Sequence, residues 1–246
     1  MTLRLRHLAA LVPLVFSGCA TTLYRPNQLP TPLLREAGEL KATVGSNNLQ
    51  LAYAPAPHVG LIANGYYGSY DQNGRSANGW LAEAGAGSFG PLPIPNLGWE
   101  AYGGVGYGRV TLNDTLDTNG ATPRPVHYDA NAVRGFIQPN LGYVTPYFEV
   151  GAGARLSGVK YLALNTRGYS AAELQDQRLV SSDVTSPVWL FLEPGVTVKA
   201  GYKWVKAFYH HVWSVKLGGK DLPYDGDADV LGVSVDLAHW YDHFSW

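Results

Sequence analysis

Single acidic and basic residues recur within apolar, glycine-rich stretches, and they are the side chains of this sequence with the most chemical potential. Strand-like alternation would place all of them on one common face. They are Glu39, Lys41, Glu83, Glu100, Arg134, Glu149, Arg155, Glu193, Lys199, Lys206, His210 and Asp236. Because an unpaired buried charge costs several kcal/mol, these six carboxylates and five permanent cations are expected to pair. We interpret the set as a lumen charge network; the alternative is a narrow polar conduit or small-ligand site.

A second candidate site is an acidic segment near the C-terminus. Alternating carboxylates can bind Ca²⁺ through their oxygens, but the remaining spacing of a calcium-binding hand is missing. A solvated acidic loop is therefore favoured, and no metal is expected. The adjacent pair His210 and His211 would point to opposite faces of a strand, so the two cannot share one metal ion. The aspartates of this segment are Asp221, Asp225, Asp227 and Asp229.

Motifs for catalysis are not evident. No Ser/His/Asp set has a nucleophile-elbow context. The glycines of 104–108 are not followed by the helix that a phosphate-binding loop requires. We expect a non-enzymatic protein without a dissociable cofactor.

Cys19, the single cysteine, closes a short targeting segment. The apolar run Leu8–Phe16 would rise only about 13 Å as a helix, too little to span a bilayer, so it reads as a signal peptide. The sequence before Cys19 resembles the lipobox of bacterial lipoproteins. This resemblance implies that residues 1–18 are removed and that Cys19 carries diacylglycerol and an N-acyl chain such as palmitate. The alternative is an ordinary signal peptide and a buried free cysteine.

The elements that must position these residues fall into two parts. Residues 19–38 are proline-rich and non-periodic, which predicts an extended, semi-rigid tether. Residues 39–246 form one all-β domain with period-two alternation. We predict a single antiparallel up-and-down β-barrel of the transmembrane type with about ten strands, or eight as the alternative. The expected strands are 39–46, 48–55, 58–69, 78–89, 98–111, 129–142, 145–158, 187–201, 203–216 and 229–240.

The links between these strands support a membrane barrel. Short links at 56–57, 90–97, 143–144 and 202 alternate with long ones at 70–77, 112–128, 159–186 and 217–228, as periplasmic turns alternate with outside loops. A capping box from Ser170 to Glu173 predicts a short helix in the longest loop. An even strand count would return the C-terminus to the side that holds the lipidated N-terminus, and we predict the periplasmic side for both.

Composition agrees with this architecture. Charged residues make up 15% of the chain, against about 25% in ordinary soluble domains. Glycine, tyrosine and tryptophan are abundant, at 29, 16 and 7 residues. An apolar face would contact lipid, with aromatic residues at the interfaces. A net charge of −1 gives no reason to expect nucleic acid as a partner.

Part of the sequence resembles a known kind of protein. The lipobox, Tyr24-Arg25-Pro26-Asn27, Gly38-Glu39-Leu40-Lys41, Leu51-Ala52-Tyr53 and His58 to Gly65 are similar to the start of uncharacterised outer-membrane β-barrel lipoproteins of the Bacteroidota type. The likeness covers roughly residues 16 to 70 and is only architectural beyond. It implies a lipidated outer-membrane barrel and transfers no site, because the family carries no assigned activity.

Three functions compete on these grounds. The first is a lipid-anchored barrel in the bacterial outer membrane with a structural, adhesive or minor channel role. The second is a soluble, lipid-tethered barrel that binds an apolar ligand, and the third is a barrel enzyme acting on lipid or peptide. Glycine and alanine mixed with single charges suit a lumen better than a solvent face, which favours the first. Its partners would be outer-membrane lipid and the machineries for lipoprotein processing and barrel assembly.

Overall fold

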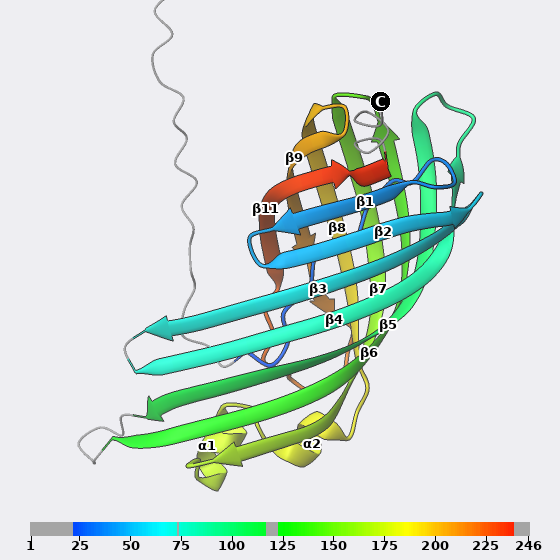
Figure 1. The fold of residues 1–246 in the computed structure, drawn as a ribbon. Coiled ribbons are helices and arrows are strands. Elements are labelled where there is room, and N and C mark those ends of the chain that lie inside the picture. Colours follow the sequence, from blue (N-terminus) through cyan, green and yellow to red (C-terminus); the bar gives the residue numbers. More distant parts are fainter. Residues whose placement is uncertain (1–21, 73, 117–122, 239–246) are drawn as a thin grey trace, which may run out of the picture.

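Ten strands close into an antiparallel up-and-down barrel in the computed structural model, which describes residues 22–72, 74–116 and 123–238 (Figure 1). Consecutive strands pair along the chain, and the β1–β11, β11–β9 and β8–β9 pairings complete the ring. The predicted ten strands are therefore confirmed. The strands are β1 (Leu40–Gly45), β2 (Asn48–Ala56), β3 (Val59–Gln72), β4 (Arg75–Pro91), β5 (Leu97–Leu116), β6 (Arg124–Val144), β7 (Phe148–Arg167), β8 (Trp189–Tyr202), β9 (Val205–Trp213) and β11 (Asp227–Asp236).

The remaining short strand, β10 (Val215–Lys216), continues β9 and does not add a strand to the wall of the barrel. β10 pairs with β8 in the register that β9 sets, immediately beyond Ser214. β9 and β10 thus form one side of the barrel, interrupted at a single residue.

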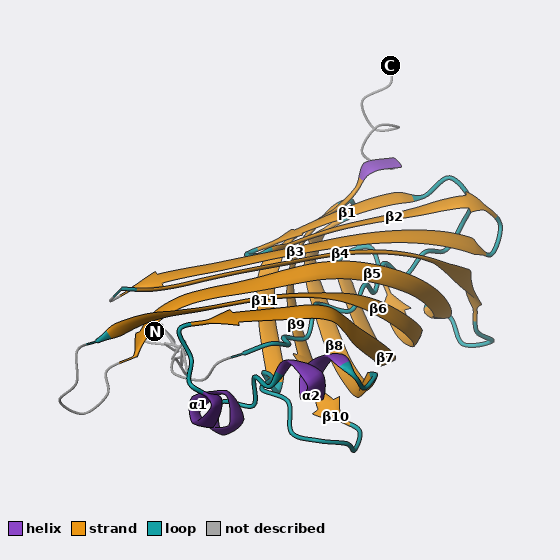
Figure 2. Ribbon diagram, turned by 90° about the horizontal axis from the view of Figure 1, so that it is seen from below, coloured by secondary structure: helices purple, strands orange, loops and turns teal. Residues whose placement is uncertain are grey.

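The two ends of the barrel differ. At one, which we call the turn end, the links are 57–58, 92–96, 145–147 and 203–204, and β11 also finishes there. At the other, the loop end, lie the longer links 168–188 and 217–226. The link 168–188 contains α1 (Ala171–Asp176), which has the predicted capping box, and α2 (Ser181–Thr185), which packs against β7; the two helices lie next to each other (Figure 2). No helix in the described part of the chain is long and apolar enough to cross a membrane.

Several strands run further toward the loop end than the sequence predicts. The predicted long link 70–77 is a tight turn between β3 and β4, and much of 112–128 and of 159–186 belongs to β5, β6 and β7. In these extensions most outward side chains are polar, for example Asn113 and Asn165, whereas Leu112 and Tyr128 are buried on the inner face. The alternation therefore continues with its apolar side turned inward, and the apolar outer face typical of a lipid-facing strand ends before these extensions.

The two faces of the wall are inverted relative to a soluble barrel. Outward positions carry exposed apolar side chains on every side of the barrel, among them Leu51, Val105, Ile137, Val198 and Leu231. Inward positions carry the buried charged and amide side chains together with buried apolar ones, such as Tyr128 and Phe191 toward the loop end. The predicted parity of β7 holds, with Phe148 and Leu156 outward and Glu149 and Arg155 buried.

Candidate functional site: the filled lumen

The segment 22–38, which we call the plug, runs inside the barrel from the loop end to the turn end. It begins among the loops: Leu23 N donates to Pro223 O at 3.0 Å, and Tyr24 forms a parallel bridge with Tyr224. Tyr161, on the inner wall of β7, donates to Leu23 O at 2.9 Å. The prediction that the N-terminal segment starts on the side where the last strand ends is therefore wrong. The predicted tether is extended, but it reaches β1 through the lumen.

Four charged residues from four strands form a compact group around the middle of the lumen, the arginine cluster (Glu83, Arg134, Arg155 and Glu193). Arg155 Nε lies 2.8 Å from Glu193 Oε2, and Arg155 Nη1 lies 3.5 Å from Glu83 Oε2. Arg134 contacts Glu193 and lies 3.2 Å from Glu83 Oε1. No side chain of the four is more than 2% exposed. Two cations and two carboxylates leave the cluster neutral, as burial requires.

The arginine cluster also holds the plug. Tyr24 OH donates to Glu193 Oε1 at 2.5 Å, and Asn27 Nδ2 donates to Glu83 Oε2 at 2.9 Å. Arg155 Nη2 donates to the Asn27 carbonyl oxygen at 2.7 Å. Each of these bonds joins a plug residue to a group that is already ionically paired, so plug and wall are satisfied together.

His210 connects the plug to β8. Leu29 N donates to His210 Nε2 at 3.3 Å, so a neutral ring carries its proton on Nδ1 and donates it to Thr197 Oγ1 at 2.6 Å. Thr31 Oγ1 donates to the same hydroxyl at 2.8 Å. His210 is fully buried and all its polar atoms are engaged, which makes it a structural member of the lumen rather than a base.

Prolines explain why the plug needs donors from the wall. Proline has no N–H and the plug is not paired as a strand, so its carbonyl groups need side-chain partners once they are buried. Pro30 O accepts from Gln138 Nε2 at 2.7 Å and from Asn140 Nδ2 at 3.0 Å. Pro32 O and Leu33 O accept from Lys41 Nζ at 3.1 and 2.9 Å.

A second charged group, the lysine cluster, lies nearer the turn end (Glu39, Lys41, Glu149, Lys199 and Lys206). Glu149 forms ion pairs with two lysines: its Oε2 lies 3.0 Å from Lys199 Nζ, and its Oε1 lies 2.7 Å from Lys206 Nζ. Lys41 Nζ lies 3.8 Å from Glu39 Oε2. Its side chains are between 5% and 8% exposed. Lys199 Nζ also donates to Thr31 O at 3.2 Å.

Carboxylates of the wall accept hydrogen bonds from the backbone N–H groups at the end of the plug. Leu34 N donates to Glu100 Oε1 at 2.8 Å, and Arg35 N donates to Glu39 Oε2 at 2.6 Å. Glu100 is further held by the hydroxyl of Tyr102 at 3.0 Å. Two of the predicted carboxylates therefore serve the plug backbone.

A glycine makes room for the plug on β6. Leu33 adopts a left-handed backbone with φ of 52°, and its side chain lies against the buried Gly142. A Cβ at Gly142 would approach Leu33 Cδ2 to 2.2 Å. The wall therefore matches the plug in shape as well as in its polar contacts.

The remaining predicted residues lie elsewhere. Asp236 is half-buried at the turn end, where its N–H donates to Trp204 O at 2.8 Å, and it is not a member of either cluster described above. Its register partner on β1 is Lys41, so the two residues lie on the same face of the wall. Cys19 lies outside the described residues.

The acidic segment is divided among different partners. Asp221 pairs with Arg178 at 3.4 Å, and Asp225 accepts from Thr22 at 3.3 Å. Burial raises the pKa of the Asp225 carboxyl. The other two stand on the outer face of β11, where Asp227 and Asp229 have ligand atoms within 4.8 Å of those of His211. The four predicted aspartates therefore form no common site.

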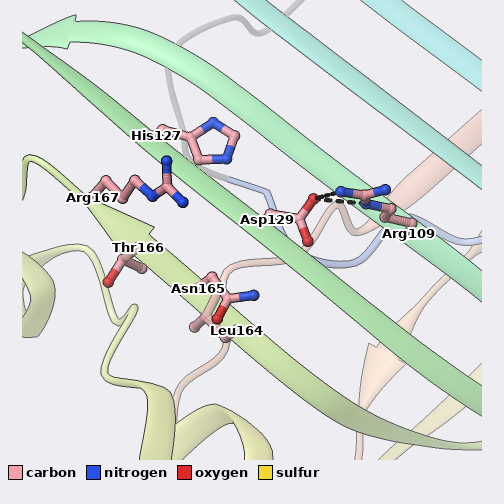
Figure 3. A pocket seen from close by; sticks show the side chains of 7 residues that line it. All are labelled: Arg109, His127, Asp129, Leu164, Asn165, Thr166 and Arg167. Atoms are coloured by element: carbon pink, nitrogen blue, oxygen red, sulfur yellow. Dashed lines mark hydrogen bonds and ion pairs between the residues drawn. The ribbon is translucent and has the colours of Figure 1, made fainter.

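A polar pocket lies on the outer face near the loop end (Figure 3). Arg109 Nη2 and Nε contact Asp129 Oδ2 at 2.5 and 2.6 Å, and His127 and Arg167 lie toward one another beyond them. The pocket offers hydrogen-bond donors but no nucleophile paired with a base. It marks the level at which the outer face changes from apolar to polar.

Sequence reasoning identified the charged wall but missed its occupant. The available signal was an excess of inward amides: Asn48, Asn64, Gln138 and Asn140 share the face of the charges, and several of them bond the plug. No protein-family model matches this chain, and no curated protein matches it.

Proposed function

We propose that this chain is a lipid-anchored β-barrel protein of the bacterial outer membrane, without enzymatic activity, whose filled lumen serves a structural or adhesive role. The observation that carries the proposal is the inverted wall: charges and amides are buried inside, and apolar side chains cover the outside. In water this arrangement would expose a large continuous apolar surface, whereas in a bilayer it satisfies both faces.

Aromatic residues support a membrane-spanning height. Exposed Trp80 and Tyr107 pack together toward the loop end, and exposed Tyr147 and Tyr202 pack together at the turn end. On β6, Val133 is the partner of Tyr107 and lies ten residues before Tyr143. At about 3.4 Å per residue and a tilt of about 40°, that distance corresponds to about 26 Å across the membrane, close to the apolar band of such barrels.

The filled lumen separates this proposal from its competitors. An apolar ligand would need an empty apolar cavity, whereas the interior here is filled by the plug, two charge clusters and apolar side chains packed against one another. A conduit would need a continuous path, which the plug occupies from Leu23 to Arg35. We therefore place the protein among barrels that act through their outer surface and loops.

The lipid anchor completes the proposal. Diacylglycerol and an N-acyl chain at Cys19 would be added by the lipoprotein-processing machinery, and the strands would be inserted by the barrel-assembly machinery. Acyl chains and a spanning barrel would give two independent membrane attachments.

Membrane fractionation tests this function directly. We expect the protein to resist extraction by alkaline carbonate, to migrate faster on a gel before heating than after, and to yield an N-terminal peptide with the mass of a triacylated Cys19. Purified protein in a planar bilayer should give no steady conductance. Release by carbonate would reject the integral barrel, and a steady pore would reject the filled lumen.

A further inference from the structure

The path of the plug determines where the lipid can be. We propose that the acyl chains on Cys19 lie in the outer leaflet of the outer membrane, at the loop end, so that the protein is anchored from the cell surface and not from the periplasm. This inference rests on the proposed function, and it reverses the side that the strand count alone had predicted for the N-terminus.

The chain leaves too little length for any other position. Cys19 comes three positions before Thr22, a reach of about 10 Å even when fully extended. Glu39 comes seventeen positions after Thr22, which corresponds to roughly 50 Å if the chain is extended at about 3.1 Å per residue. Thr22 lies at the loop end, where Tyr128 OH donates to its carbonyl oxygen at 3.0 Å. An acyl chain on Cys19 therefore cannot enter the leaflet at the turn end.

Contacts with a single strand show the direction of threading. β8 runs from the loop end to the turn end, and the plug meets it in the same order. Tyr24 bonds Glu193, Thr31 Oγ1 bonds Thr197, and Thr31 O accepts from Lys199. A segment that looped back to the turn end would meet these residues in another order.

The outward direction of the loop end follows from the links. Membrane barrels place short turns in the periplasm and longer connections outside. The turn end has links of two to five residues and the end of β11, whereas the loop end has the link 168–188 with two helices. Arg25 is 44% exposed there, beside Asp225 at 3.8 Å. The start of the plug is therefore on the proposed outer surface.

A cross-link tests the threading itself. In the double variant Thr31→Cys/Thr197→Cys the two sulfurs replace hydroxyls that are 2.8 Å apart, so mild oxidation should form an intramolecular disulfide in most of the folded protein. The matched control, Thr31→Cys/Val196→Cys, places the second thiol on the outer face and should not cross-link. Absence of the first disulfide, or equal formation of both, would overturn the threading.

Surface labelling tests the leaflet. With a membrane-impermeant maleimide on intact cells, Arg25→Cys and the loop-end reference Ala171→Cys should be labelled, and the turn-end variant Ile94→Cys only after permeabilisation. Protection of Arg25→Cys with labelling of Ala171→Cys would overturn the threading. Protection of both with labelling of Ile94→Cys would overturn the leaflet. Labelling of the wild-type protein after denaturation would instead reveal a free Cys19 thiol, which rejects the lipid anchor and leaves the cross-link result standing.

Discussion

The arginine cluster and the lysine cluster stabilise buried charged side chains in different ways. Both bury charges in one lumen, but the arginine cluster has two cations and two carboxylates, whereas the lysine cluster has three cations and two carboxylates. In the arginine cluster each guanidinium contacts the two carboxylates Glu83 and Glu193, which come from β4 and β8. In the lysine cluster the ammonium groups divide their bonds between wall carboxylates and the carbonyl oxygens of the plug.

This difference follows from the shape of the two cations. A guanidinium is a rigid planar fork that can satisfy two carboxylates at once, while an ammonium is a point charge on a flexible stem. The arginines therefore tie strands across the lumen to one another. The lysines follow an irregular, proline-containing segment whose carbonyl groups point in different directions. We infer that the arginine cluster ties the wall strands together as well as binding the plug, whereas the lysine cluster mainly positions the carbonyl groups of the plug.

The largest effect should come from breaking the arginine cluster. Arg155→Ala leaves Glu83 and Glu193 with one guanidinium and frees the Asn27 carbonyl, so we expect a loss of about 3–5 kcal/mol in the free energy of unfolding. Denaturant unfolding in detergent micelles measures it. Arg167→Ala, an exposed rim arginine, is the control and should change stability by less than about 0.5 kcal/mol. Equal effects of the two would mean that the cluster is not structural.

A smaller and more local effect is expected in the lysine cluster. Lys41→Ala removes the donor to Pro32 O and Leu33 O, which should cost about 1.5–3 kcal/mol. Hydrogen exchange should rise at Leu34 and Arg35, with little change in β1. Lys206→Ala, which bonds Glu149 and no plug carbonyl, is the matched control and should leave those amides protected. Strand-wide exchange in Lys41→Ala would refute a division of labour between the clusters.

A steric change probes the plug without touching charge. Gly142→Ala pushes against Leu33, so we expect a loss of about 1–2 kcal/mol as the leucine shifts. Gly135→Ala on the same strand meets no atom within 4 Å and is the control. Melting temperatures of the two variants provide the comparison. Identical values would indicate that Leu33 is not seated on Gly142.

The smallest effect lies outside both clusters, in α1. A hydrogen bond from Arg124, together with those from Ser170, lowers the pKa of Glu173 from 4.5 to about 2. Because the folded-state pKa is the lower one, the stabilisation is complete above about pH 4.5 and is lost as the pH falls toward 2. Amide exchange in α1 should rise over that range while the barrel stays protected, and Glu173→Gln should abolish the pH dependence. A pH-independent exchange rate in the wild type would contradict the capping role.

The strands of the barrel wall and their two faces could be predicted from the sequence, but the plug inside the barrel could not. Alternation across Phe148 to Leu156 was sufficient to separate the faces and to place Glu149 and Arg155 inside, because strand geometry is local. The plug has no periodicity, and prolines only exclude helix and paired strand. Its burial depends on partners such as Glu193 and Gln138, more than a hundred residues away, which no local pattern encodes.

The route of the plug also decides how the molecule would respond to tension. The segment passes through a closed ring of strands and turns back at the turn end into β1, which runs toward the loop end. A pull on the N-terminus from the loop end would first load the bonds between the plug and the wall, which lie along the line of force. Only after these bonds had broken would the pull reach β1, at the turn end, and peel its ladders to β2 and β11 open from that end. A protein built this way would resist tension on its anchor mainly through the contacts of the plug.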